Sequence, residues 1–276
     1  MGKYTLLYEK LLSEKIISPD QVFPGPQAEL KDLLLAHDIR YINGISDGSL
    51  PAQELRPIGL PWSPGMYQRS LSSVGGFIAA TENAISDGFS ALLAGGTHHA
   101  HRDRGEGYCV FNDFAVAALR LLTTNRLKKI LIIDLDVHQG NGNSSILGGR
   151  DDVFILSLHG EKNYPFRKVK SHLDVALPEG TGDELYLSEL EKGMKLLPDA
   201  DMIFYQAGVD VLKEDKLGTF AMTYEGIRQR DRMIFDFAIR KNLPLAMAIG
   251  GGYSQPIDFS IEAYANTFRE ARIAFK

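Results

Sequence analysis

Short apolar runs alternate with segments of helical spacing along this chain of 276 residues. Runs that are apolar at nearly every position are typical of strands buried on both faces, as in a parallel sheet. They cover residues 90–94, 129–136, 153–158, 202–207 and 243–249. Helical spacing of apolar residues is found over residues 71–87, 113–123, 183–197, 224–241 and 257–275. This alternation predicts an α/β fold with a mostly parallel, doubly wound sheet flanked by helices.

No linker or internal repeat divides the chain, so we predict that residues 1–276 form a single domain. A hydrophobic content of 44% over this length is enough to bury a large core. Residues 19–66 are rich in Pro, Gly and Asp, which predicts substantial loops there.

Composition narrows the class of protein. The formal net charge of -5 provides no basic patch, which argues against direct binding to nucleic acid. The single cysteine, Cys109, excludes an internal disulfide and favours a reducing compartment. The sequence shows no secretory signal and no apolar run of about 18 residues, as a membrane span requires. We therefore expect a cytoplasmic protein with no membrane partner, and the sequence leaves its oligomeric state open.

Acidic and histidine side chains follow two of the predicted strands. Asp134, Asp136 and His138 alternate along the end of one strand, so they can project on the same face. Asp210 follows the strand at residues 202–207 after a glycine turn. A lone strand-end aspartate is more often a cap or turn residue. Catalytic zinc takes three protein ligands and keeps one open position, and Asp136, His138 and Asp210 are the candidates.

Two further motifs carry candidate catalytic groups. His98 and His99 follow Gly95 and Gly96, and Tyr253 follows three glycines after the strand at residues 243–249. A histidine beside a metal is suited to take a proton from a bound water, and a phenol is suited to donate to a developing oxyanion. Tandem histidines together with the strand-end acids favour a hydrolytic metal site over isolated structural roles.

In this order, over about residues 60–275, these motifs resemble those of the histone deacetylase family, which has the arginase/deacetylase fold. The resemblance implies a zinc ion held by Asp136, His138 and Asp210. It implies that His99 is the general base and then acid, that His98 is its electrostatic partner, and that Tyr253 polarises the scissile carbonyl.

The resemblance also implies how substrate and a second ion are bound. The backbone carbonyl of Gly107 would accept the substrate amide, and Tyr108 and Tyr164 would form the walls of an acyl-lysine tunnel. Asp134 would support His98 and also bind a structural potassium ion, together with backbone carbonyls near Ser157 and Leu158.

Two positions depart from the commonest family pattern. The first class of the family has a histidine and an aspartate where this chain has Gln139 and Asn141. His99 would then face an amide, which stabilises an imidazolium less than a carboxylate does. The segments at residues 103–107 and 139–142 are most similar to the class IV branch.

We therefore predict a zinc-dependent amidohydrolase that removes acetyl or longer acyl groups from lysine side chains of proteins or peptides. Longer chains are expected if the glycines at residues 95, 96 and 250–252 leave free volume in the tunnel floor. An acetylpolyamine amidohydrolase is an alternative, although Leu217 stands where polyamine-specific members have a gatekeeping glutamate.

Two other functions compete with this prediction. A binuclear manganese hydrolase of the ureohydrolase type needs additional bridging carboxylates where this chain has Gln139 and Asn141. A catalytically silent acyl-lysine binding module would have lost a metal ligand, the second histidine or the tyrosine, and none of these is missing from the sequence.

Overall fold

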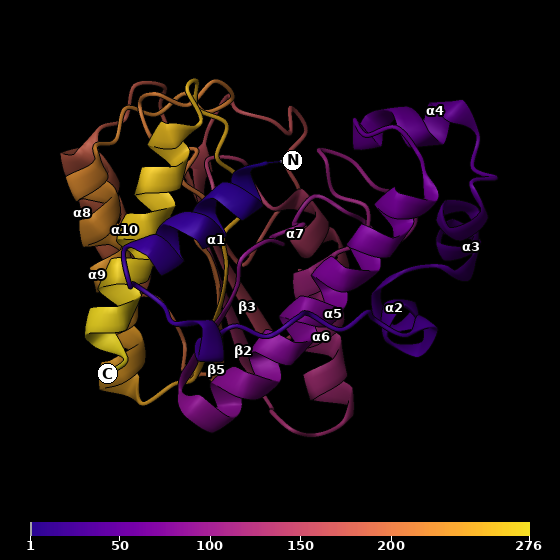
Figure 1. The fold of residues 1–276 in the computed structure, drawn as a ribbon, viewed down its shortest axis with the longest axis horizontal. Coiled ribbons are helices and arrows are strands. Elements are labelled where there is room, and N and C mark those ends of the chain that lie inside the picture. Colours follow the sequence, from indigo (N-terminus) through magenta and orange to yellow (C-terminus); the bar gives the residue numbers. More distant parts are fainter. Residues whose placement is uncertain (1) are drawn as a thin grey trace.

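A sheet of parallel strands forms the centre of the computed structural model, which describes residues 2–276 (Figure 1). Within the described residues the sheet has six strands in the order β1-β6-β5-β2-β3-β4. All neighbouring strands run parallel. The strands are β1 (Phe89–Leu92), β2 (Ile130–Asp134), β3 (Val153–Gly160), β4 (Leu173–Leu177), β5 (Met202–Gln206) and β6 (Leu245–Ala248). The predicted α/β fold is confirmed.

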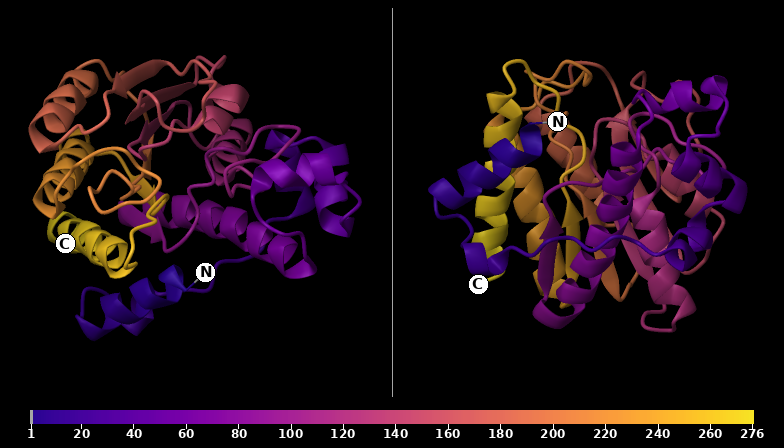
Figure 2. Two further views of the ribbon diagram at one scale, coloured as in Figure 1. Left: turned by 90° about the horizontal axis from the view of Figure 1, so that it is seen from above. Right: turned by 45° about the vertical axis from the view of Figure 1, so that its right-hand side comes forward.

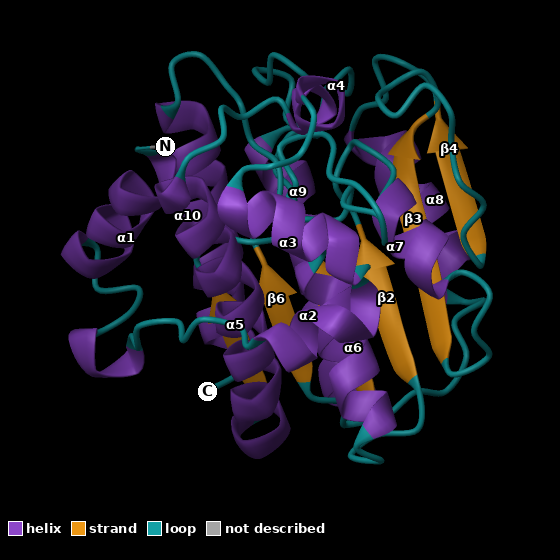
Figure 3. Cartoon of the chain, turned by 90° about the vertical axis from the view of Figure 1, so that its right-hand side faces the viewer, coloured by secondary structure: helices purple, strands orange, loops and turns teal. Residues whose placement is uncertain are grey.

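Helices cover both faces of the sheet (Figures 1 and 3). One layer contains α1 (Lys3–Ser13), α8 (Asp183–Met194), α9 (Tyr224–Lys241) and α10 (Asp258–Ala274). The other contains α2 (Leu30–Ala36), α3 (Ile39–Asp47), α5 (Pro64–Asp87), α6 (Asp113–Thr123) and α7 (Asn141–Leu147). The short helix α4 (Ala52–Leu55) and single turns at Pro19–Gln21 and Arg56–Ile58 complete the N-terminal part. Helices α1 and α10 lie side by side although they come from opposite ends of the chain (Figure 2).

Side chains of the central strands point alternately into two cores. Ile130 and Ile132 of β2 lie in the core beneath α5 and α6, whereas Leu131 and Ile133 lie in the core beneath α8, α9 and α10. All four are almost completely buried. Burial on both faces explains why this run is apolar at every position.

Two parts of the fold differ from the sequence prediction, and a third adds helices to the predicted loops. Strand β4 was not predicted because it lies at the sheet edge and its burial alternates, so it lacks a continuous apolar run. Helix α5 begins at Pro64 instead of residue 71, where the Ser63 hydroxyl accepts a hydrogen bond from the Met66 N–H. Residues 19–66 contain α2, α3 and α4 between their loops.

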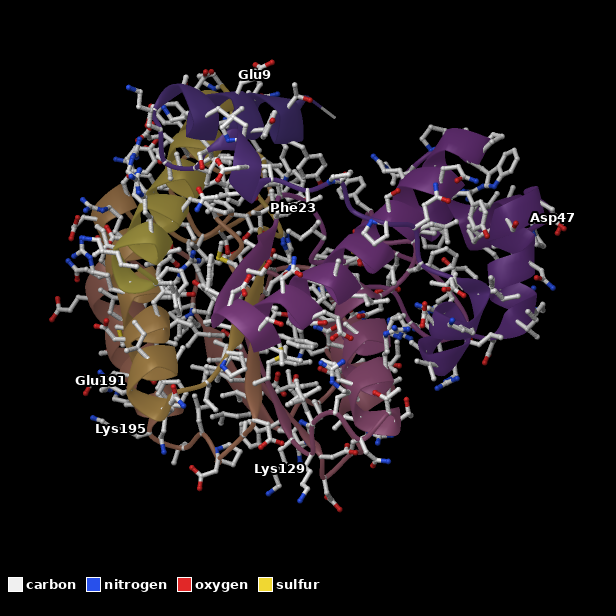
Figure 4. All side chains as sticks on the ribbon, turned by 60° about the horizontal axis from the view of Figure 1, so that its bottom comes forward. Glu9, Phe23, Asp47, Lys129, Glu191 and Lys195 are labelled. Atoms are coloured by element: carbon white, nitrogen blue, oxygen red, sulfur yellow. The ribbon has the colours of Figure 1, made fainter. Side chains whose placement is uncertain are left out.

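The strand order brings the predicted site residues to one edge of the sheet. Strands β1, β6, β5 and β2 are consecutive neighbours, and each is followed by one of the motifs singled out in the sequence. The carboxyl ends of parallel strands form the usual ligand-binding edge of such sheets. Charged side chains such as Glu191 and Lys195, which pair at 2.8 Å, lie at the periphery of the molecule (Figure 4). Over residues 2–276, no helix combines the length and apolar character needed to cross a membrane.

Candidate active site

A buried acid-histidine-acid group lies at the carboxyl ends of β2 and β5. The group consists of Asp136, His138 and Asp210. Each offers one potential ligand atom, and these three atoms all lie within 4.8 Å of one another. His138 Nδ1 is 3.0 Å from Asp136 Oδ1 and 3.1 Å from Asp210 Oδ2. One nitrogen and two carboxylate oxygens are a donor set that suits a catalytic zinc ion, so these residues fit the predicted metal.

Backbone N–H groups hold the two carboxylates in place. The Val137 N–H donates to Asp210 Oδ1 at 2.9 Å, and the Gly251 N–H donates to Asp136 Oδ2 at 2.8 Å. A side chain at position 251 would overlap Asp210, so glycine is what permits this close approach. The loops after β2, β5 and β6 thus fix the acids to one another.

The electrostatics of the group favour a cation. Burial raises the pKa of Asp210 to about 7, and the nearby charge of Asp136 adds to this effect. Burial alone would lower the pKa of His138, but its hydrogen bonds with the two aspartates raise it to about 10. Two buried carboxylates this close favour a positive charge beside them, which a metal ion would supply in place of the histidine proton.

The two adjacent histidines have different partners. His98 Nδ1 donates to Asp134 Oδ2 at 2.8 Å, and His99 Nδ1 donates to Asn141 Oδ1 at 2.7 Å. Burial opposes the charged form of His98, but Asp134 raises the pKa of His98 to about 9. Burial lowers the pKa of His99 well below its usual range, and the charge on His98 acts in the same direction. These shifts favour the charged form of His98 and the neutral form of His99, whose Nε2 can then accept a proton.

Tyr253 follows β6 and is fixed by two residues that the sequence did not single out. Its backbone N–H donates to Asp215 Oδ2 at 2.6 Å. The Lys3 ammonium lies 5.1 Å from the centre of the Tyr253 ring and donates to the carbonyl of Gly250 at 3.1 Å. Lys3 and Gly250 are 247 residues apart in the sequence, so no local pattern predicts this contact.

Three of the predicted substrate-binding residues lie beside the two catalytic candidates. The Tyr164 ring meets the His99 ring edge-on with centroids 5.0 Å apart, and the Tyr108 and Tyr253 centroids are 6.1 Å apart. Gly107 has a φ of 57°, and a Cβ there would lie 2.6 Å from His99 Cδ2, so the loop requires glycine. Tyr108 is 49% exposed and Leu217 is 43% exposed, so both side chains are accessible from solvent.

The predicted potassium ligands lie on adjacent strands. Asp134 at the end of β2 is in register with Ser157 of β3, and Leu158 is the next residue. The Ser157 hydroxyl is 3.0 Å from His159 Nδ1. Strand register therefore places Asp134 beside Ser157, and the potassium site stays a prediction.

Gln139 and Asn141, the two departures from the commonest pattern, have separate roles. The Gln139 side chain turns toward β4 and the segment before it. Its amide donates to Val169 O at 2.9 Å and to Asp174 Oδ1, in β4, at 2.7 Å. The Asn141 amide donates to Glu106 Oε1 at 2.5 Å. Sequence reasoning did not single out Glu106, because a lone acid in a loop carries no local signal of its partner.

The site glycines do not leave open space. A Cβ at Gly96 would overlap the Gln206 amide, and one at Gly252 would lie 2.6 Å from the Tyr264 hydroxyl. A Cβ at Gly250 would lie 2.8 Å from Gln206 Nε2. The volume expected beside these glycines is therefore filled by neighbouring side chains.

Comparison with known proteins identifies the family. The histone deacetylase domain model matches residues 1–267. An uncharacterized protein from Picosynechococcus sp. is 39% identical over 275 residues, and the alignment covers 99% of this chain and 92% of that protein. Histone deacetylase 2 from Arabidopsis thaliana is 31% identical over 264 residues, with coverage of 91% of this chain and 68% of that protein.

A further relative and a solved structure are also similar to this chain. Acetylpolyamine amidohydrolase from Mycoplana ramosa is 31% identical over 212 residues, which cover 70% of this chain and 60% of that protein. The crystal structure of an HDAC homolog complexed with SAHA has a TM-score of 0.82 at 24% identity, covering 97% of this chain and 77% of that one. From the domain match and these relatives, the chain belongs to the histone deacetylase family of hydrolases.

Proposed function

We propose that the protein is a zinc-dependent hydrolase that removes acetyl groups from lysine side chains of proteins or peptides. The observation that carries the proposal is the buried group of Asp136, His138 and Asp210, with the His99 ring centroid 6.0 Å from that of His138. A ligand set and a neutral base thus lie side by side, as amide hydrolysis at a metal requires.

The proposed chemistry divides between the metal and the side chains. Zinc, when bound by Asp136, His138 and Asp210, supplies a Lewis acid for the amide carbonyl and lowers the pKa of a water molecule. His99 Nε2 takes a proton from the attacking water and returns it to the leaving lysine amine. The Tyr253 hydroxyl donates a hydrogen bond to the oxygen that becomes negatively charged, and charged His98 stabilises the same negative site.

The substrate half of the proposal rests on the residues around His99. The Gly107 carbonyl would accept the substrate amide N–H, and Tyr108 and Tyr164 would pack against the lysine stem. We propose lysine over a polyamine because Leu217 is neutral, and a neutral side chain offers no partner to a second ammonium group. The Mycoplana ramosa relative keeps acetylpolyamine hydrolysis as the second candidate.

Acetyl is the acyl group that the glycine contacts favour. Free volume beside Gly96 and Gly250 was the reason to expect longer chains, and the Gln206 amide occupies that volume. Octanoyl and myristoyl chains would therefore have to displace packed side chains.

We also propose that potassium binds near Asp134, Ser157 and Leu158. The class IV assignment stays a prediction.

A substrate panel tests the proposed function. The zinc-loaded protein is assayed with one peptide carrying acetyl-, octanoyl- or myristoyl-lysine, and with acetylspermidine. We expect kcat/KM to be highest for acetyl-lysine and to fall with chain length. Preference for acetylspermidine would support the second candidate, and no turnover of any substrate would support a silent binding module.

A further inference from the structure

Glu106 lies directly behind the amide that faces His99. Its carboxylate Oε1 accepts a hydrogen bond from Asn141 Nδ2 at 2.5 Å, and Asn141 Oδ1 accepts one from His99 Nδ1 at 2.7 Å. The three groups form a chain of hydrogen bonds from a carboxylate, through an amide, to the imidazole. The Glu106 side chain is 16% exposed, so this chain is largely shielded from water.

The charge of Glu106 favours one orientation of the Asn141 amide, whose Nδ2 also lies 3.1 Å from His101 Nε2. Burial alone would raise the pKa of Glu106, but hydrogen bonds with His101, Asn141 and Tyr164 lower it to about 2. An ionised carboxylate only accepts hydrogen bonds, so the amide must turn its NH2 group toward Glu106. Its oxygen is then directed at His99 Nδ1.

The orientation of the amide in turn fixes the tautomer of His99. Asn141 Oδ1 is an acceptor, so His99 Nδ1 must carry the proton. The proton-free nitrogen is then Nε2, which is the atom that a base must present. If the amide were reversed, its NH2 group would face Nδ1, and the favoured tautomer would carry its proton on Nε2.

We propose that Glu106 is a positioning residue for the hydrolysis, which orients the Asn141 amide and so holds His99 in the tautomer that accepts a proton at Nε2. Glu106 supplies a negative charge to His99 through the intervening Asn141 amide. A carboxylate in direct contact with the histidine would supply the same charge without an intermediate. The amide between them carries this influence by polarisation. This inference rests on the proposed role of His99 as the base.

Moving the carboxylate from position 106 to position 141 tests the inference. Glu106→Gln keeps the shape of the side chain but removes the charge that orients the amide. Asn141→Asp places a second carboxylate against Glu106, and two like charges at this distance repel. In the double variant E106Q/N141D, the glutamine can donate to the aspartate, and the aspartate can accept from His99 Nδ1.

The measurement is kcat and KM of the four zinc-loaded proteins on one acetyl-lysine peptide, with zinc content and thermal unfolding followed in parallel. We expect each single variant to lose about tenfold in kcat with KM nearly unchanged, the loss expected for one charge-assisted hydrogen bond. The double variant should recover to within about threefold of the wild type, because strongly coupled neighbours are not additive. Asp103→Asn, in the same loop and 61% exposed, is the matched control and should behave as wild type.

Three results would overturn the inference: wild-type kcat for E106Q, a double variant whose losses multiply, or single variants that lose zinc or unfold without recovery in the double variant. His99→Ala separates this inference from the proposed function. If His99→Ala is inactive while E106Q is fully active, only the role of Glu106 is wrong. If His99→Ala keeps wild-type turnover, the proposed catalytic role of His99 fails, and the inference fails with it.

Discussion

The carboxylate of Asp215 accepts a hydrogen bond from the backbone N–H of Tyr253 at 2.6 Å. Its other oxygen accepts hydrogen bonds from the N–H groups of Leu217 and Gly218 at 2.8 and 2.9 Å. One side chain therefore joins the loop after β5, which contributes Asp210, to the loop after β6, which contributes Tyr253. The backbone of Tyr253 is thus anchored by a residue that has no role as a metal ligand or substrate contact in our account.

Asp215→Ala should lower turnover without removing the metal. The substitution leaves three backbone N–H groups without their acceptor, which would let the Tyr253 loop shift relative to Asp210. We expect kcat to fall about 10- to 100-fold, since a displacement near 1 Å is enough for such a loss. Steady-state kinetics and metal analysis check this, with Asp199→Ala, 95% exposed at its side chain, as control. Unchanged kcat would show that other contacts hold the loop.

Asp210→Ala should remove metal and activity together. Asp210 Oδ2 lies 3.1 Å from His138 Nδ1, and the proposed site has one other carboxylate ligand, Asp136. We expect one zinc per chain in the wild type and a large loss of occupancy in the variant, because a three-ligand site loses much of its affinity with one ligand. Full zinc occupancy in metal analysis of the variant would exclude Asp210 as a ligand.

Tyr253→Phe should separate chemistry from binding. The phenol is proposed to stabilise the developing oxyanion, so its loss should reduce kcat by about 100-fold or more and leave zinc in place. The substitution keeps the ring and the backbone bond to Asp215. Kinetics and metal analysis on the same preparation provide the measurement, and undiminished turnover would assign the tyrosine a structural role.

Leu217→Glu should shift substrate preference toward polyamines. Leu217 is 43% exposed, so a carboxylate there can meet a second ammonium group on a substrate. We expect the ratio of kcat/KM for acetylspermidine to that for an acetyl-lysine peptide to rise relative to wild type. Leu217→Gln is the matched control, since glutamine has the shape of glutamate without its charge. A rise of equal size in both variants would show that charge is not the cause.

The strand-end residues could be predicted because their signal is local. Asp136, His138 and Asp210 each follow an apolar run, and parallel strands place such positions at one edge, where the structure brings all three together. Strand β4 could not be predicted in this way, because its alternating burial at the sheet edge leaves only a short, interrupted pattern.

Contacts between residues far apart in the chain could not be predicted from a single sequence. Lys3 contacts the carbonyl of Gly250 from the opposite end of the chain, and Glu106 reaches Asn141 from a different loop. Each is an ordinary charged residue whose partner is set by tertiary packing. The glycines at the site led to a wrong prediction of free volume. Small residues indicate either free space or close packing, and the contacts of Gly96 with Gln206 show close packing.

The most direct test of the account is a zinc titration of metal-free protein, with hydrolysis of an acetyl-lysine peptide as the readout. The wild type should be inactive without metal and should reach maximal kcat at one equivalent of zinc per chain. His99→Ala should bind the same equivalent and remain inactive, since it keeps the ligands but lacks the base. Activity that is independent of zinc, or that requires two equivalents of manganese, would contradict the central claim.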